Sequence, residues 1–394
     1  MRIAIVSDYF NDFVGGAQTS MHEQYLALTA AGHHVVMVSA GRGRRGGKVR
    51  HRENGLELQT AFTLPGVELP VIPNNTGTRS VLDRYFREHA IDVVHVQTEF
   101  GLAHAAATVA ERLDIPVVHT VHTFYWSSEG VWHAALAPLI RFMLRRVIRW
   151  DIPRKPLSPR PVDNLLRNLT LAMALRADTV VSPSAHQADD LAAHGVSRPV
   201  VVPNPITTSP RPAVPLTLAQ ASRPRFLWVA RCEPVKRPLE FARAAIDALA
   251  RTGNGFSIDF VGDGSALASL RRLAAKHGQL RVHGALPHEE VLDLMDASSA
   301  VALTSVGFDN QPMTVAEAVS RERGVLYCDS RLGEGLSASG FLSESPDVDG
   351  LAEGLATLVT HPELLVGLSE GAAREKEEFS PSRYVERILE AYRR

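Results

Sequence analysis

Short apolar runs recur through the first half of the chain, and segments with helical spacing separate them. The runs that predict strands lie at residues 3–7, 35–39, 93–96, 117–121, 179–182 and 200–202. Helical spacing follows the first run at Met21, Tyr25 and Leu28, and a further helix is expected at 103–112. Strands that are apolar on both faces and alternate with helices indicate a parallel sheet covered on both sides. The first half therefore predicts a doubly wound α/β domain.

The same pattern restarts after a proline-rich segment at 207–225, which we interpret as an interdomain linker. Strands are then expected at 226–230, 257–261, 280–283, 300–304 and 325–328, and helices at 238–249, 265–277, 289–297, 314–320 and 384–392. We predict an N-terminal domain at 1–206 and a C-terminal domain at 226–380. The last helix, 381–394, is expected to pack back on the N-terminal domain.

Composition narrows the class of protein. The 394 residues exceed what one core usually serves, and 45% hydrophobic with 22% charged residues argues against disorder. Lys plus Arg (42) balances Asp plus Glu (43), so no overall field favours nucleic acid as a partner. Two cysteines, Cys232 and Cys328, provide no disulfide framework and suit a cytoplasmic protein. No stretch approaches the roughly 18 apolar residues of a membrane span.

Two cations lie where the strand 226–230 leads into the helix at 238. Arg231 and Lys236 suit a diphosphate there, because a helix N-terminus adds free N–H groups and the positive end of its dipole. The next strand ends in a glycine turn, Gly262 to Gly264, with Ser265 expected to cap the following helix. Both segments fit an ordinary solvated turn equally well.

The strongest cluster holds two carboxylates eight positions apart, Asp309 in a loop and Glu317 on a helix. A loop carboxylate accepts hydrogen bonds from sugar hydroxyls, and a helical one matches the two donors of a ribose diol. Taken singly, each also fits a solvated loop Asp or a salt-bridged Glu. The chain lacks a P-loop and the spaced dinucleotide fingerprint, which weakens the kinase and dehydrogenase hypotheses.

Together these motifs resemble the retaining glycosyltransferases of family 4. The family's Arg-x4-Lys pair is similar to Arg231 and Lys236, its glycine turn to Gly262 and Gly264, and its Glu-x7-Glu motif to Asp309 and Glu317. Further matches lie in the first half: the glycine loop Gly15 and Gly16, the turn Gly32 and His33, and His122 after a strand. The resemblance implies the GT-B fold, in which two Rossmann-like domains face each other across a cleft, the first binding acceptor and the second donor. Asp309 departs from the family's Glu by one methylene.

The resemblance also implies residue roles. Arg231 and Lys236 would neutralise the donor diphosphate, Asp309 would hold the sugar, and His122 would contact the sugar near its reacting carbon. The other residues expected to bind donor are Gly15, Gly16, Gly262, Gly264, Leu286, Asn310, Gln311, Pro312, Met313, Thr314 and Glu317. Neither a metal nor a cofactor is expected, because the two cations supply the charge that the leaving diphosphate needs.

The implied reaction is retaining transfer from a UDP- or GDP-linked sugar to a hydroxyl acceptor on a glycan, glycolipid or lipid-linked intermediate. Two alternatives stay open: a catalytically silent nucleotide-sugar-binding scaffold, and a phosphorylase or epimerase on the same fold. His122 also fits a buried polar group. A metal ion bound by His119 and His122 would need a third and a fourth ligand, and the sequence shows no apparent candidates for them.

An insertion between Phe124 and Asn168 predicts a basic amphipathic helix. Its apolar positions are Leu136, Leu139, Ile140, Leu144, Val147 and Ile148, and its basic positions, interleaved with them, are Arg141, Arg145, Arg146 and Arg149. Such a helix fits peripheral contact with an anionic membrane through 134–150, a cover for the acceptor pocket, or ordinary packing on the domain. A second basic stretch, Arg42, Arg44, Arg45, Lys48, Arg50 and Arg52, fits either an acidic acceptor or a solvated loop.

Overall fold

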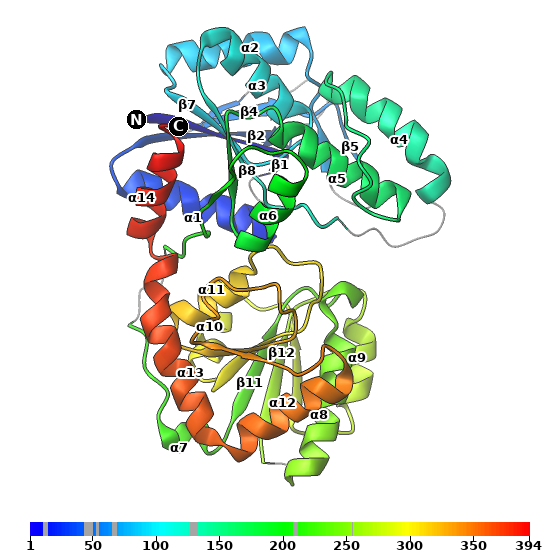
Figure 1. The fold of residues 1–394 in the computed structure, drawn as a ribbon, viewed down its shortest axis with the longest axis vertical. Helices are drawn as coiled ribbons and strands as arrows, with labels where there is room; N and C mark the ends of the chain where they lie inside the picture. The colour runs from blue at the N-terminus through cyan, green and yellow to red at the C-terminus, as the bar shows by residue number, and fades with distance from the viewer. Residues whose placement is uncertain are drawn as a thin grey trace. The chain divides into compact units, whose positions relative to one another are not determined.

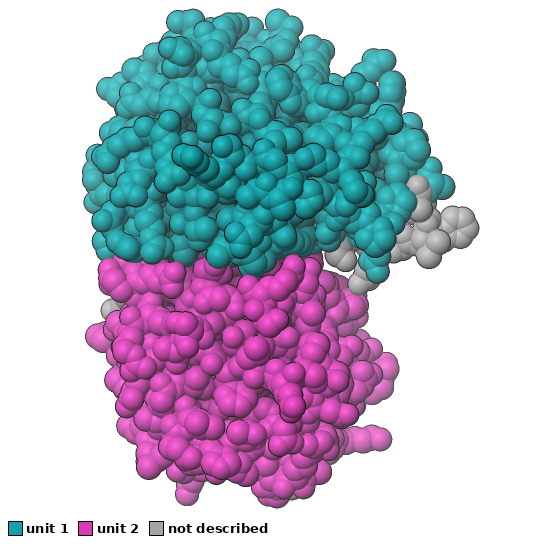
Figure 2. Space-filling view, viewed as in Figure 1, with its two compact units in different colours: residues 1–205, 381–394 teal, residues 206–380 magenta. Residues whose placement is uncertain are grey.

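The computed structural model describes residues 1–10, 15–42, 50–52, 55–64, 69–126, 133–207, 212–253 and 255–394. They form two compact units (Figure 2). Unit 1 comprises Met1–Pro205 and Pro381–Arg394, and unit 2 comprises Ile206–Ser380. Of the second basic stretch, Arg44, Arg45 and Lys48 lie outside the described residues.

Within its described residues, unit 1 contains an eight-stranded sheet with the order β10-β9-β8-β7-β1-β2-β4-β3. Its strands are β1 (Arg2–Phe10), β2 (His34–Gly41), β3 (Arg50–Arg52), β4 (Gly55–Gln59), β7 (Val93–Val96), β8 (Val117–Thr120), β9 (Thr179–Ser182) and β10 (Val200–Val201). Neighbouring strands pair in parallel, except that β3 runs antiparallel to β4. Two short strands, β5 (Phe62–Leu64) and β6 (Leu69–Val71), form a separate antiparallel pair.

Helices cover both faces of this sheet (Figure 1). They are α1 (Gly16–Ala30), α2 (Thr76–Glu88), α3 (Gly101–Leu113), α4 (His133–Ile148), α5 (Pro161–Ala174), α6 (Ala185–Ala193) and α14 (Pro381–Ala391). Alternation along β1 explains the two layers: Ala4 and Val6 pack with α2 and α3, whereas Ile3 and Ile5 pack with α1 and α14. The C-terminal helix α14, red in Figure 1, lies beside α1.

Unit 2 repeats the architecture with a six-stranded parallel sheet in the described chain, ordered β13-β12-β11-β14-β15-β16. Its strands are β11 (Arg225–Val229), β12 (Ser257–Val261), β13 (Leu280–Gly284), β14 (Ala300–Leu303), β15 (Gly324–Tyr327) and β16 (Gly340–Leu342). Its helices are α7 (Leu218–Ala221), η1 (Pro234–Lys236), α8 (Pro238–Thr252), α9 (Leu267–Ala274), α10 (His288–Asp296), α11 (Met313–Ser320), α12 (Val348–Thr360), α13 (Pro362–Glu375) and η2 (Lys376–Phe379). Two parallel α/β sheets in two units confirm the predicted fold class.

The segment that we predicted to be a linker, 207–225, differs from that interpretation. Its described residues belong to unit 2, and Leu216 and Ala221 are buried in the core of that unit. The backbone N–H of Leu216 also donates to Ser369 Oγ at 3.1 Å. A few apolar side chains therefore anchor this proline-rich segment, although its composition is typical of a linker.

Candidate functional site

The strand order of unit 2 reverses at its centre. From β11 the chain proceeds outward through β12 and β13, and then returns to β14 on the other side of β11. Open α/β sheets bind ligands outside the carboxyl ends of the strands at such a reversal. Arg231 and Lys236 follow β11, and Asp309 follows β14, so the fold brings the predicted clusters to one edge.

Lys236 and Asp309 form an ion pair at this edge. Their side chains are only 15% and 11% exposed, so solvent screens the pair less than it would on an open surface. The second carboxylate oxygen of Asp309 accepts a hydrogen bond from Ser305 Oγ. The Lys236 ammonium also lies 5.0 Å from the centroid of the Phe308 ring. Both charged groups are therefore held in fixed positions.

A network around Thr304 fixes the turn that carries Lys236. Trp228 Nε1 donates to Thr304 Oγ1 at 2.9 Å, and this hydroxyl donates to the Lys236 carbonyl at 2.7 Å. Arg237 Nη1 donates to the Thr304 carbonyl at 3.2 Å. The turn after β11 is thus fastened to the end of β14. Sequence reasoning missed Thr304 and Ser305, although their position directly after an apolar strand was a usable signal.

Arg231 supplies a second cation, and its side chain is exposed. Within the described ranges its guanidinium makes no hydrogen bond or ion pair. Helix α11 begins nearby with Pro312 as N-cap, and Thr314 Oγ1 donates to the carbonyl of Val229 at 3.3 Å. The first N–H groups of a helix, here at Met313 and Thr314, have no partner within it. An available Arg, a fixed Lys and a helix N-terminus suit an anionic ligand.

The remaining predicted residues of this cluster are distributed around α11. Glu317 lies in the second turn with its side chain 12% exposed, and its Oε1 is 4.0 Å from His288 Nδ1. Asn310 and Gln311 are buried in the loop before the helix. Leu286 is partly buried against the apolar cluster that contains β11 and α11 residues. All of them belong to unit 2.

The glycine turn after β12 has a structural explanation that needs no ligand. Gly262 has φ 137° and Gly264 has φ 154°, a region that L side chains rarely adopt. A Cβ on Gly262 would lie 1.8 Å from the Ala230 carbonyl oxygen. The prediction that Ser265 caps the next helix is wrong, because α9 begins at Leu267 without a side-chain cap and Ser265 Oγ donates to Glu233 instead.

In unit 1 the strand order reverses between β1 and β7, and His122 follows the neighbouring β8. His122 Nε2 lies 2.5 Å from Gln97 Oε1. Gln97 Nε2 donates to Gln24 Oε1 at 3.0 Å, and Gln24 Nε2 donates to Ser20 Oγ at 3.0 Å and to Asn204 Oδ1 at 3.2 Å. This chain of amides fixes the orientation of Gln97, so its oxygen faces the ring and Nε2 of His122 carries the proton.

Burial lowers the pKa of His122 to about 4, so its ring is neutral at neutral pH. With the proton on Nε2, Nδ1 has a lone pair for a hydroxyl donor. His119 is fully buried, and its two ring nitrogens have no hydrogen-bond partner in the described structure. Among the described residues, no group of three or more His, Cys, Asp or Glu side chains is placed to hold a metal ion.

Two buried carboxyl groups near the same edge were not predicted. Asp8 follows the apolar part of β1 and accepts from Thr98 Oγ1 at 2.7 Å and from the N–H of Leu102 at 2.6 Å. Glu99 accepts from Thr170 Oγ1 at 2.9 Å. Burial raises the pKa of Asp8 to about 6 and that of Glu99 to about 8. Their positions just after strands were the available signal.

The predicted glycine loop lies at the start of α1. Gly15 is the N-cap and Gly16 the first helical residue. A Cβ on Gly16 would meet no described atom within 4 Å, so packing does not require glycine there.

Comparison with known proteins identifies the family. The family model described as Glycosyltransferase Family 4 matches residues 14–210, and that described as Glycosyl transferases group 1 matches 223–361. The chain belongs to family 4 of the glycosyltransferases.

The relatives match over limited lengths. One subunit of the phosphatidylinositol N-acetylglucosaminyltransferase of Arabidopsis thaliana is 31% identical over 126 residues, which is 32% of this chain and 28% of that protein. Alpha-monoglucosyldiacylglycerol synthase of Acholeplasma laidlawii is 31% identical over 132 residues, 32% of this chain and 30% of that protein. The chain thus matches less than a third of the length of these two relatives.

Solved structures share the fold over the full length. Sucrose-phosphate synthase from Thermosynechococcus elongatus has a TM-score of 0.68 at 16% identity, covering 100% of this chain and 98% of that one. HepE of Anabaena in complex with UDP has a TM-score of 0.68 at 15% identity, covering 99% of each chain. These similarities establish the GT-B architecture.

Proposed function

We propose that this protein is a retaining hexosyltransferase that uses a UDP- or GDP-linked sugar and a hydroxyl acceptor on a glycan or a lipid-linked molecule. The observation that carries the proposal is the edge of unit 2 where Lys236 pairs with Asp309 beside the uncommitted Arg231. The bound UDP of HepE and the lipids in the names of two relatives support this donor and acceptor class.

In the proposed reaction, the bond between the anomeric carbon and the diphosphate oxygen breaks, and negative charge accumulates on the leaving group. Arg231, Lys236 and the start of α11 oppose that charge. Asp309 would accept hydrogen bonds from sugar hydroxyls, and Glu317 from the ribose diol. The acceptor oxygen attacks from the face that the diphosphate leaves, and its proton passes to the diphosphate. His122 would contact the sugar near its reacting carbon during transfer.

This scheme gives the pair of Lys236 and Asp309 a specific role. The lysine holds the carboxylate in one orientation, and a diphosphate offers the same ammonium a second anionic partner. Fixed cations provide the charge compensation for which other enzymes use a metal ion. We therefore expect transfer without an added divalent ion.

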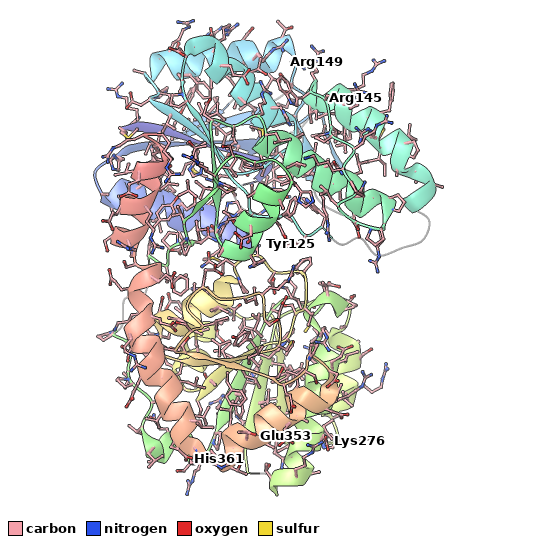
Figure 3. All side chains as sticks on the ribbon, in the orientation of Figure 1. Tyr125, Arg145, Arg149, Lys276, Glu353 and His361 are labelled. Carbon is pink, nitrogen blue, oxygen red and sulfur yellow. The ribbon has the colours of Figure 1, made fainter. Side chains whose placement is uncertain are left out.

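Nucleotide-dependent stabilisation tests the donor site. A ligand that binds only the folded chain raises its apparent stability, so we expect UDP or GDP to raise the Tm of the wild type. Lys236→Ala and Glu317→Gln should each weaken this binding by roughly 10-fold or more, because charge-assisted hydrogen bonds contribute about 1.5–3 kcal/mol. Lys276→Ala and Glu353→Gln are matched controls at exposed positions of unit 2, labelled in Figure 3, and should respond as the wild type does.

Equal stabilisation of all four variants would contradict the site assignment. Nucleotide binding without transfer to glycan or lipid acceptors would instead support the silent-scaffold alternative. Release of a sugar phosphate that requires inorganic phosphate would identify a phosphorylase.

A further inference from the structure

A basic groove lies on unit 1, and none of its lining residues takes part in the proposed reaction. It has a volume of about 780 Å³ and is formed by α4 and the segment that follows it. Its charged lining consists of Arg141, Arg145, Arg146, Arg149 and Arg154, with Asp151 as the opposing charge. Figure 3 labels Arg145 and Arg149 near the C-terminal end of α4. Such a concentration of cations points to an anionic ligand.

Helix α4 presents apolar side chains on two sides. Ile148 is fully buried, and Ile140, Leu144 and Val147 pack around it against residues of α5. Outside this packed face, four further apolar side chains remain 46–56% exposed: Leu136, Leu139, Phe142 and Met143. Trp150, just after the helix, is 43% exposed. Ordinary packing of an amphipathic helix accounts for the side chains around Ile148 but leaves the exposed apolar side chains uncovered.

Helical geometry places Arg145 and Arg146 next to the exposed apolar residue Phe142. Arg141 and Arg145 are four residues apart and form a row along the helix, and Arg149 lies just after its last residue. Leu139 and Met143 lie on the other side of the helix from this row, because successive residues turn by about 100°. Arg145 and Arg146 instead follow Phe142 by three and four residues and lie next to it, and the Arg146 guanidinium is 4.9 Å from the centroid of the Phe142 ring. Arginines next to exposed large apolar residues are typical of helices that lie in a membrane interface.

The arginines have few anionic partners within the protein. Arg145 lies 3.1 Å from Asp151, and Arg141 donates to the carbonyls of Ile152 and Pro153. Burial, followed by the nearby charge of Arg154, lowers the pKa of Arg141. The guanidinium groups of Arg149 and Arg154 make no hydrogen bond or ion pair inside the described part of the chain. An external anion would relieve the mutual repulsion of these neighbouring arginines.

We propose that α4 and the arginine groove form a docking site for an anionic membrane, with a phosphate-bearing lipid headgroup in the groove. Leu136, Leu139, Phe142 and Met143 would enter the boundary between headgroups and acyl chains. These exposed apolar side chains favour a membrane over a soluble polyanion, because a polyanion would need only the arginines. No helix in the described residues is long and apolar enough to cross a membrane, so attachment through this surface would be peripheral. The inference does not depend on the proposed transfer reaction.

Vesicle co-sedimentation of the full chain tests this site. The wild type should bind vesicles of phosphatidylcholine with phosphatidylglycerol at least about 10-fold more strongly than vesicles of phosphatidylcholine alone, because each basic residue contributes about 1 kcal/mol at an anionic surface. Reversing two charges, Arg145→Glu with Arg149→Glu, should abolish this preference. The matched control, Arg223→Glu with Arg272→Glu, changes two exposed arginines of unit 2 and should bind as the wild type does.

A second variant separates the membrane from a soluble anion. Leu139→Ser with Phe142→Ser changes exposed side chains only, so folding should persist, and binding to anionic vesicles should fall by about 10-fold or more. Wild-type vesicle binding by either double variant on α4 would overturn the proposal. So would heparin binding that needs the arginines but not Leu139 and Phe142. Stabilisation by UDP or GDP, measured on the same samples, reports the donor site separately.

Discussion

At the scale of single residues, the hydrogen bond between His122 and Gln97 gives a testable account of how the imidazole acts. The pKa of His122 is lowered to about 4 by burial, and Gln97 keeps the proton on Nε2. Gln97→Glu would place a carboxylate at this bond and favour the imidazolium, which raises the pKa of His122. Protonation would then remove the lone pair of Nδ1 at a higher pH.

We therefore expect Gln97→Glu to shift the acid limb of the profile of kcat against pH upward, so that activity at pH 5–6 falls more than at pH 8. The neutral variant Gln97→Leu should lower kcat by about 10-fold at all pH values, because it removes the orienting partner without adding charge. Identical pH profiles for Gln97→Glu and the wild type would contradict this role of His122.

The individual residues of the donor site could be predicted from the sequence, but their contacts could not. Arg231, Lys236 and Asp309 were chosen from their positions after apolar strands and from the family resemblance. Their assembly depends on β14 pairing with β11, which joins residues 73 positions apart in the contact of Lys236 with Asp309. Strand order is decided by tertiary packing, so spacing alone could not predict that Lys236 would contact Asp309.

At the scale of elements, the start of α1 and the turn after β12 use glycine for different reasons. Gly16→Ala adds a methyl group where no described atom lies within 4 Å, and Ala stabilises helices by up to about 1 kcal/mol relative to Gly. We expect unchanged or higher stability with kcat/KM lowered by roughly 10-fold or more, because the methyl group would displace a substrate that approaches the backbone. Urea unfolding and donor kinetics measure the two effects.

Gly278→Ala is the matched control, since its Cβ also meets no described atom within 4 Å and it lies between α9 and β13, outside the segments that carry the proposed donor residues. It should change neither stability nor kinetics appreciably. In contrast, Gly262→Ala should destabilise the chain by about 3 kcal/mol or more, because its Cβ would clash with the Ala230 carbonyl. Wild-type kinetics for Gly16→Ala would exclude the glycine loop from the substrate site.

Elements with strong apolar patterns were predicted well, and those without such patterns were not. The strands β1, β7 and β9 are largely buried on both faces, and each appeared as a run rich in Val or Ile. The antiparallel pairing of β3 with β4 was not predicted, because β3 is the polar stretch Arg-His-Arg and its alignment depends on the neighbouring strand. Tertiary pairing rather than local preference determines such short edge strands.

At the scale of the whole molecule, the chain leaves unit 1 at Pro205 and returns to it at Pro381. The returning helix α14 is part of the core of unit 1, where fully buried Ile388 belongs to the same cluster as Ile3 and Ile5. Tyr392, just after the helix, bonds His95 Nδ1 through its hydroxyl group at 2.8 Å. The last helix of the sequence is therefore needed to complete the core on one face of the unit 1 sheet.

Ile388→Ala tests this dependence. Loss of a fully buried side chain should destabilise unit 1 by about 2–5 kcal/mol, whereas Glu390→Ala, exposed on the same helix, should change stability by less than about 0.5 kcal/mol. Hydrogen exchange followed by mass spectrometry would locate the effect. Because α14 packs in unit 1, Ile388→Ala should weaken protection in β1 while leaving β11 and the nucleotide-induced stabilisation of unit 2 unchanged. Equal loss of protection in β1 and β11 would mean that both units unfold as a single cooperative body.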